Sequence, residues 1–192
     1  MEGDTIFHEG KHFVRVSHVV KDEEQFKFVK KDVLQKKQIM GTKIHEGIED
    51  FQKNEFPILN SITAHYFSSF KLWNDYLKPT ILCQEKRFFC HQHLFTGKPD
   101  NIVQFEHEPF PAVVDFKACA QEADSWVLQG HLYHFLARQD FSRLSDTIYF
   151  IRLKPNGSLP KVYTYKLSFK TEQECLKKVE KYWEEKKDWT KC

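Results

Sequence analysis

Two carboxylates and a lysine lie in the middle of the chain at a spacing that could do chemistry. Pro99-Asp100 is followed further along by Asp115-Phe116-Lys117. Two carboxylates and an ammonium group are suited to holding a divalent metal ion and a water molecule beside a phosphodiester. This set favours a metal-dependent nuclease over a chain without a catalytic role.

The segment around Asp115 explains why the charged groups face the same way. Residues 112–118 are largely apolar and rich in types that favour a β-strand. Side chains alternate across a strand, so Asp115 and Lys117 share one face, while Val114 and Phe116 pack on the other. Charged residues are disfavoured inside an apolar strand unless they are paired or functional.

Asp100 is expected to lie next to Asp115. Residues 83–92 and 94–105 resemble extended segments, and Thr96-Gly97-Lys98-Pro99 supplies turn residues within the second. A meander of this kind would place Asp100 and Asp115 on adjacent strands. The alternative is a chance Asp-x-Lys pattern that forms only a surface ion pair.

A second pair of polar residues follows on a predicted helix. Asp124-Ser125 is a good N-cap, and residues 126–138 form a helix in which Gln129 and Tyr133 lie one turn apart on one face. That face could flank the carboxylates and hydrogen-bond a phosphate or a base. If the pair stood alone, a core Tyr133 and a solvated Gln129 would be favoured. The core-facing positions of the helix are Leu128, Leu132, Phe135 and Leu136.

A histidine upstream completes the candidate set. Residues 41–49 start a helix whose buried stripe is Ile44, Ile48 and Phe51. His45 and Glu49 lie together on an adjoining face. An imidazole suits manganese or iron as an additional ligand, although a lone histidine is more often structural or exposed.

Taken in order, these residues resemble the motifs of the PD-(D/E)xK nuclease superfamily, and within it the RecB-like exonucleases of phages, mitochondria and CRISPR systems. The match covers roughly residues 40–135. It runs through Gly41-x-x-x-His45, Glu85, Gly97-x-Pro99-Asp100, Asp115-x-Lys117 and Gln129-x-x-x-Tyr133. The order and spacing are more specific than any single motif.

The resemblance implies an α/β fold with a central mixed β-sheet flanked by helices, a restriction-endonuclease-like core. It implies that His45, Asp100 and Asp115 bind Mg²⁺ or Mn²⁺ together with the backbone carbonyl of Phe116. Lys117 would orient or deprotonate the attacking water. Glu85 is either an acidic residue near the metal or a strand carboxylate paired with Lys86 or Arg87.

Several lysines are candidates for contacts with DNA. A cluster before His45 lies on a predicted amphipathic helix that places Phe26, Val29, Val33 and Met40 inward. Lysines 177–191 alternate with glutamates and favour a solvated helix face. Arg143 and Arg152 are further candidates without an assigned place. The lysines predicted to contact phosphates are Lys36, Lys37, Lys43 and Lys98.

The remaining patterns complete the expected architecture. An aromatic stripe at helical spacing, Ile62, Tyr66, Phe70, Trp73 and Leu77, is interpreted as core. Residues 147–153 and 161–168 are predicted strands joined by a turn at 155–157, and 171–189 is the last helix. At 192 residues with 18 phenylalanines, the chain fits one nuclease domain over 1–192, with motifs in 41–133 and closing elements in 147–189.

Composition bounds the cofactors and the setting. The formal net charge of +2 is too small to establish nucleic-acid binding. Five cysteines without a Cys-x-x-Cys pair predict no disulfide framework, and the spacing of Cys175 and Cys192 predicts no iron–sulfur cluster. Cys90, His91 and His93 fall on opposite faces of a strand, which disfavours zinc. No signal peptide or membrane span is evident, so an intracellular setting is expected, with the compartment and the oligomeric state open.

Three functional hypotheses follow. The favoured one is a Mg²⁺- or Mn²⁺-dependent exonuclease acting on single-stranded DNA or DNA ends in replication, recombination or repair. The second is a catalytically inactive DNA-binding accessory protein, against which the intact set of charged residues argues. The third is a dimeric endonuclease with sequence specificity, which a chain of this length without an evident recognition domain makes less favoured.

Overall fold

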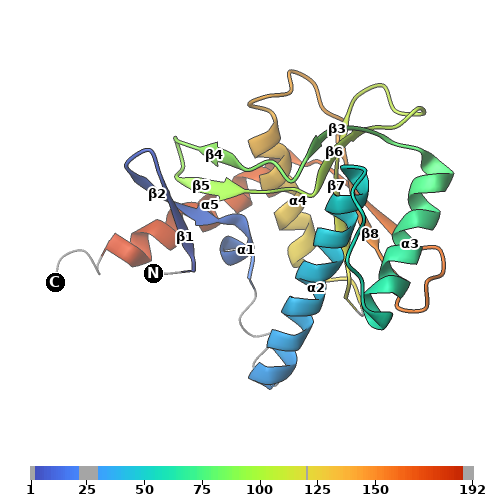
Figure 1. Ribbon diagram of the computed structural model, residues 1–192. Coiled ribbons are helices and arrows are strands. Elements are labelled where there is room, and N and C mark those ends of the chain that lie inside the picture. The colour runs from blue at the N-terminus through green and yellow to red at the C-terminus, as the bar shows by residue number, and fades with distance from the viewer. Residues whose placement is uncertain (1–2, 22–29, 120, 188–192) are drawn as a thin grey trace.

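The structure is a computed structural model that describes residues 3–21, 30–119 and 121–187. These residues form two mixed β-sheets flanked by helices (Figure 1). The four-stranded sheet has the order β1 (Thr5–His8), β2 (Lys11–Arg15), β5 (Phe95–Gly97), β4 (Phe88–Cys90). The five-stranded sheet has the order β3 (Thr80–Gln84), β6 (Asn101–Gln104), β7 (Ala112–Lys117), β8 (Thr147–Arg152), β9 (Lys161–Lys166). The helices are α1 (Val16–Val19), α2 (Lys31–Gln52), α3 (Ser61–Leu77), α4 (Ser125–Ala137) and α5 (Phe169–Lys187).

The five-stranded sheet carries β7 at its centre. β7 pairs with β6 in antiparallel orientation and with β8 in parallel. Asn101 is opposite Val114, so Asp100, just before β6, faces the position of Asp115. The predicted strands at 112–118, 147–153 and 161–168 are confirmed within one or two residues. Gly157 adopts a φ of 74° in the connection between β8 and β9, as the predicted turn requires.

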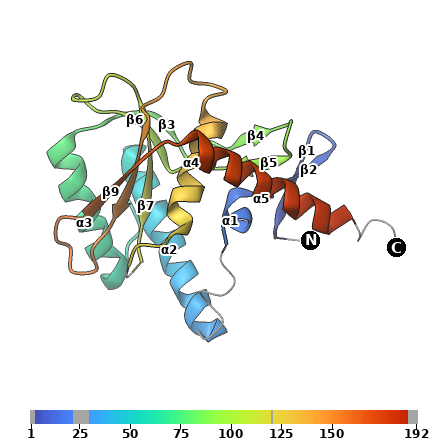
Figure 2. The same ribbon diagram turned by 180° about the vertical axis from the view of Figure 1, so that it is seen from behind.

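Helices cover both faces of this sheet, as Figures 1 and 2 show from opposite sides. α2 and α3 pack on one face around Ile44, Phe70 and Trp73, which contact Val114 and Phe116 of β7 in one buried cluster. α4 packs on the other face. Val114 and Phe116 therefore point away from α4, and Asp115 and Lys117 point toward it, as the alternation predicted.

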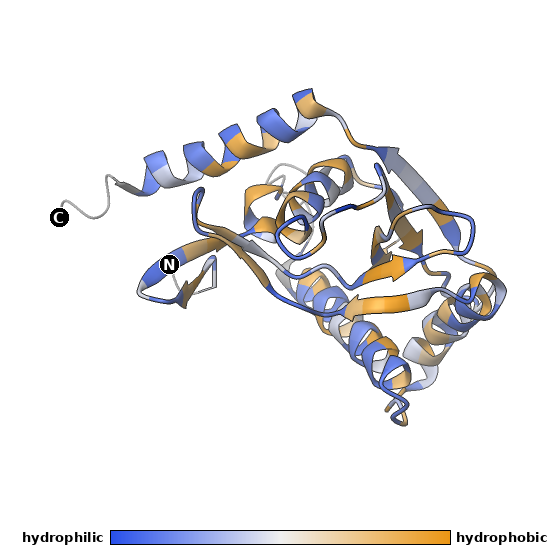
Figure 3. Cartoon of the chain, turned by 90° about the horizontal axis from the view of Figure 1, so that it is seen from above, coloured by the Kyte–Doolittle hydropathy of each residue, from blue (hydrophilic) through white to orange (hydrophobic). Residues whose placement is uncertain are grey.

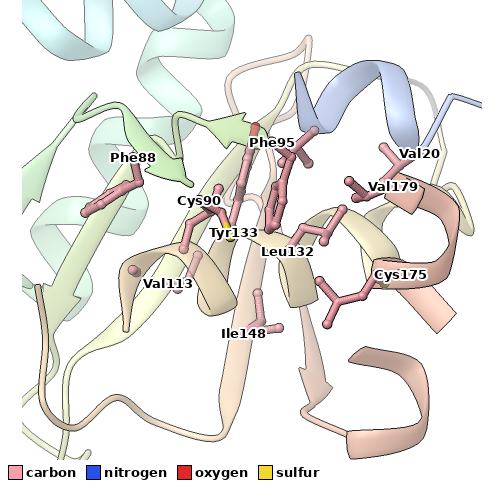
Figure 4. Packing of buried hydrophobic residues seen from close by; sticks show 14 of the residues in the cluster. Val20, Phe88, Cys90, Phe95, Val113, Leu132, Tyr133, Ile148, Cys175 and Val179 are labelled. Carbon is pink, nitrogen blue, oxygen red and sulfur yellow. The ribbon is translucent and has the colours of Figure 1, made fainter. Parts of the chain in front are cut away.

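α4 also joins the two sheets. Its residues Leu132 and Tyr133 share a buried cluster with Phe95 of β5 and with Val113 of β7 (Figure 4). This close approach requires Gly97, because a Cβ there would lie 2.8 Å from side-chain atoms of Leu136 and of Tyr133. The contact fixes α4 at the junction between the sheets, next to Asp100.

The C-terminal helix α5 is amphipathic and closes this side of the molecule. Cys175, Leu176 and Val179 are buried against α4, and Trp183 donates a hydrogen bond to the carbonyl of Leu94 at 3.1 Å. Figure 3 shows hydrophobic and hydrophilic residues alternating along it toward the C-terminus. None of the helices in the described ranges is both long and apolar enough to cross a lipid bilayer.

The chain does not turn where a turn was predicted. Residues 96–99 run from β5 of one sheet toward β6 of the other, and the reversal lies instead at 91–94, where Leu94 has a φ of 56°. The predicted strand 83–92 is likewise divided into β3 and β4 at Glu85, with a φ of 49°. The two arms of one long hairpin, β3–β4 and β5–β6, therefore each pass from one sheet to the other, and they do so side by side.

Smaller corrections concern the helices. α2 is a single helix from Lys31 onward, so no new helix starts at Gly41. Val33 and Ile62, predicted to be inward, are 38% and 59% exposed. Asp124 makes no capping hydrogen bond through its side chain at the start of α4. The predicted positions of residues 22–29 and of 188–189 lie outside the described residues.

Candidate active site

The junction of the two sheets gathers the predicted acidic residues and the histidine. Asp100 is buried and accepts a hydrogen bond from the backbone N–H of Phe116 through Oδ2, at 2.6 Å. Its other oxygen, Oδ1, lies 3.0 Å from Nδ1 of His45, which α2 carries across from the opposite face of the sheet. The strand pairing and one helix thus hold His45 and Asp100 together.

A group able to hold a metal ion stands at this point. One ligand atom each from His45, Glu85 and Asp100 lies within 4.8 Å of the others. Two carboxylates and an imidazole fit a hard divalent cation such as Mg²⁺ or Mn²⁺, and the nitrogen donor favours Mn²⁺ of the two. Asp115 is adjacent to this group, and its Oδ2 lies 2.6 Å from Nζ of Lys117.

Glu85 lies where the chain passes from β3 of one sheet to β4 of the other, and its backbone fixes its position. Its backbone adopts the left-handed conformation, and its N–H donates to the carbonyl of Asp100 at 2.9 Å. Its carboxylate pairs with Lys98, whereas Lys86 pairs with Asp140. The alternative partners expected for Glu85 were Lys86 and Arg87, and neither forms an ion pair with it in the described chain.

Lys117 is fixed from two sides. Its Nζ lies 2.6 Å from Oδ2 of Asp115 and donates to Oε1 of Gln129 at 2.7 Å. Gln129 in turn donates to the hydroxyl oxygen of Tyr133 at 2.9 Å. The predicted face of α4 thus flanks the carboxylates, and a chain of hydrogen bonds sets the position of the lysine.

The pKa values of the site residues are shifted because several carboxylates lie close together and are largely buried. Burial and the neighbouring charge of Asp100 raise the pKa of Asp115 to about 6. The same two causes raise the pKa of Glu85 to about 7. Burial opposes the charged form of His45, but the carboxylate of Asp100 outweighs it and raises the pKa of His45 to about 9. Burial likewise opposes ionisation of Asp100, yet His45 holds its pKa below the usual value.

Other predicted residues lie elsewhere. The carboxylate of Glu49 pairs with Lys53 at 2.6 Å rather than joining the group. Lys36 and Lys43 are exposed on α2, nine and two residues before His45, which places them about half a turn away, on the opposite side of the helix. Lys37 is also exposed.

The two arginines without an assigned place have different neighbours. Arg152 is opposite Lys117 in the pairing of β7 with β8. Arg143 lies over the ring of Phe110, 5.6 Å from its centroid. Two further arginines near the site, Arg15 and Arg87, were missed because their approach depends on the pairing of β2 with β5, far apart in sequence.

None of the cysteines in the described part of the chain belongs to the metal-binding group. Cys90 is buried toward α4, while the ring of His91 lies 5.1 Å from that of Phe13 on the opposite face, as strand alternation predicted. Cys175 is buried against α4. Cys192 lies outside the described residues.

Solved structures share the fold of this chain. The sequence matches no protein-family model and no curated protein. An alkaline exonuclease of Laribacter hongkongensis, LHK-Exo, in complex with dAMP, matches with a TM-score of 0.52 at 11% identity, over 93% of this chain and 94% of that chain. A second structure of LHK-Exo matches with a TM-score of 0.51 at 9% identity, over 90% and 87%. SSO0001 matches with a TM-score of 0.51 at 12% identity, over 91% and 76%.

These likenesses establish the fold. The chain has the mixed α/β fold of these structures, with a central sheet flanked by helices as predicted. At these identities the likeness extends to the fold alone.

Proposed function

We propose that the protein is a Mg²⁺- or Mn²⁺-dependent deoxyribonuclease of the RecB-like branch, an exonuclease acting on single-stranded DNA or DNA ends. The observation that carries the proposal is the position of Lys117, fixed between Asp115 and Gln129 beside the group formed by His45, Glu85 and Asp100. The names of the solved structures with this fold, which include an exonuclease bound to dAMP, support the same activity.

The donor set defines how a metal ion would be held. His45, Asp100 and Asp115 are the proposed ligands with the backbone carbonyl of Phe116, and Glu85 adds a further carboxylate beside Asp100. When bound, the ion lowers the pKa of a coordinated water and neutralises charge on the phosphate. Protonated His45 has to release its proton before its Nδ1 can act as a ligand.

The side chains of β7 and α4 then do the positioning. As an ammonium group, Lys117 orients the attacking water on the side of the carboxylates; to take the proton of that water it would first have to give up its own proton and act as the neutral amine. Gln129 keeps the ammonium group in place through its Oε1, and Tyr133 keeps Gln129 in place through its hydroxyl group. In this proposal the attack of water on the phosphorus breaks the P–O3′ bond, so one product keeps a 5′-phosphate and the leaving 3′-oxygen takes up a proton to become a 3′-hydroxyl group.

Incubation with end-labelled single- and double-stranded DNA tests this proposal. We expect release of mononucleotides with Mg²⁺ or Mn²⁺, none with chelator, and none from Lys117→Ala within the same time. Discrete internal fragments would identify an endonuclease instead. Retained binding without cleavage under every metal condition would contradict the proposal and identify a DNA-binding accessory protein.

A further inference from the structure

The four-stranded sheet has an outer face that points away from α4. Phe95 and Gly97 of β5 contact α4, so Thr96 between them points to the opposite side. Thr96 is paired with Arg15 of β2 on one side and with Phe89 of β4 on the other. Paired residues of neighbouring strands share a face, so Arg15 and Phe89 lie on the outer face.

Arg87 belongs to the same face and leads to the candidate active site. It directly precedes β4, two residues before Phe89 and two after Glu85. Arg15 lies beside Thr96, and Arg87 lies two residues from Phe89, the residue on the other side of Thr96. The side chains of both arginines are partly buried. The two cations therefore share one small area of this face and are partly withdrawn from water.

The described part of the chain holds no ion pair for either guanidinium group. Glu85 is an acid whose charge acts on Arg87, but its carboxylate is paired with Lys98. Nε of Arg15 is buried without a hydrogen-bond acceptor. Two like charges and an unsatisfied donor are unfavourable together, and one anion with several acceptor oxygens would relieve both.

A phosphate group fits this requirement. The planar fork of a guanidinium group matches two phosphate oxygens, which a lysine does not. Arg87 is two residues from Glu85, so their Cα atoms are at most about 7 Å apart. A phosphate held there would therefore lie next to one placed at the metal-binding group.

Aromatic rings on the outer face favour an unpaired strand over a duplex. The ring of Phe89 is stacked with that of His8, with centroids 4.0 Å apart and an interplanar angle of 14°. The side chain of His8 is 40% exposed at the edge of the stack. Nucleic-acid bases stack on such rings when they are not covered by neighbours in a duplex.

We propose that the outer face binds single-stranded DNA, with Arg15 and Arg87 holding the phosphate next to the cleaved bond and the His8–Phe89 stack holding a base. This inference rests on the proposed nuclease function and specifies its substrate. It assigns the entry of the strand to the four-stranded sheet rather than to the lysines of α2.

Fluorescence anisotropy with a labelled oligothymidine in chelator measures this binding without cleavage. We expect the double variant Arg15→Gln/Arg87→Gln to bind at least tenfold more weakly. The slope of its log affinity against log salt concentration should be shallower by about 0.7 for each phosphate that it no longer neutralises. Phe89→Ala is expected to bind about 5- to 150-fold more weakly. Lys86→Gln is the matched control, because Lys86 lies over Phe88, a residue of the α4 side, and pairs with Asp140.

Two results would overturn the inference. One is a double variant that binds no more weakly than Lys86→Gln. The other is a wild-type protein that binds a blunt duplex as tightly as the single strand. Arg15→Lys/Arg87→Lys keeps both charges without the forks, and we expect its affinity to fall between those of the wild type and the glutamine variant. Equal melting temperatures would exclude unfolding as the cause.

Cleavage by the wild-type protein separates this inference from the proposed function. If the protein cleaves DNA with a metal ion but its binding does not depend on either arginine, the nuclease proposal stands and the proposed role of the outer face is wrong. If binding depends on the arginines but no cleavage occurs, the outer face binds DNA and the nuclease proposal is wrong.

Discussion

Two adjacent regions of the molecule carry opposite charge. At the end of the five-stranded sheet, His45, Glu85 and Asp100 form a group that suits a cation. On the outer face of the four-stranded sheet, Arg15 and Arg87 form a pair that suits an anion. Glu85 and Arg87 are two residues apart, so the boundary between the regions is one short segment of chain. Under the proposed function, one DNA strand would be bound by the cationic region and cleaved at the acidic one.

The largest effect is expected from substitutions that change only the acidic region. Lys117→Ala or Asp115→Asn should lower the rate of metal-dependent DNA cleavage by about 10²- to 10⁴-fold, because a positioned proton-transfer group is removed or displaced. Rates on labelled DNA measure this, with circular dichroism to show that the fold survives. Binding of oligothymidine in chelator should persist, because Arg15 and Arg87 are untouched. Cleavage near the wild-type rate would contradict the roles assigned to β7.

The relative positions of these side chains were predictable from sequence because they depend on local periodicity. Alternation along β7 places Asp115 and Lys117 on one face, and one helical turn joins Gln129 to Tyr133. Both statements need only a strand and a helix, whose hydrophobic patterns are clear. The order of the motifs then adds His45 and Asp100.

The rest depends on pairing between distant segments. The turn-forming residues at 96–99 predicted a reversal of the chain. In the structure they instead connect β5 of one sheet to β6 of the other, and Gly97 has no side chain that would clash with α4. The arginine pair requires β2 to lie parallel to β5, which no periodicity reveals. Ile62 fits a helical stripe yet is exposed, because it lies in the first turn of α3 and lines an open hollow with Val33 and Met40 of α2 rather than the core.

Glu85 tests where the acidic region ends. Glu85→Gln should weaken Mn²⁺ binding by about 10- to 100-fold, as removing a carboxylate at or beside a metal centre does. Isothermal titration calorimetry with Mn²⁺ measures the affinity. Glu49→Gln is the matched control, because that carboxylate faces Lys53. An equal loss of Mn²⁺ affinity in both variants would mean that neither carboxylate binds the ion and that each only adds negative charge to the surroundings.

The pH dependence should separate the two regions. The pKa of His45 is raised to about 9, so below this pH a proton has to leave before Mn²⁺ binds. Affinity for Mn²⁺ should therefore rise with pH up to about 9, by at most about tenfold for each pH unit that His45 controls. Titrations at pH 7, 8 and 9 measure this. Binding of oligothymidine in chelator should change little over that range, since arginine stays charged.

The smallest expected effect concerns Lys98, which lies between the regions. Its ammonium group pairs with the carboxylate of Glu85 and therefore competes with a metal ion for that carboxylate. The side chain of Lys98 is 41% exposed. Lys98→Gln should strengthen Mn²⁺ binding about two- to fivefold, since exposed ion pairs contribute little. The measurement belongs at pH 9, where protons no longer compete for the carboxyl group of Glu85, whose pKa is about 7. The same variant should weaken oligothymidine binding by a similar small factor, because one positive charge near Arg87 is removed. Opposite signs for the two ligands are the signature of a boundary residue. Weaker binding of both would instead mean that Lys98 holds Glu85 in the geometry that the metal needs.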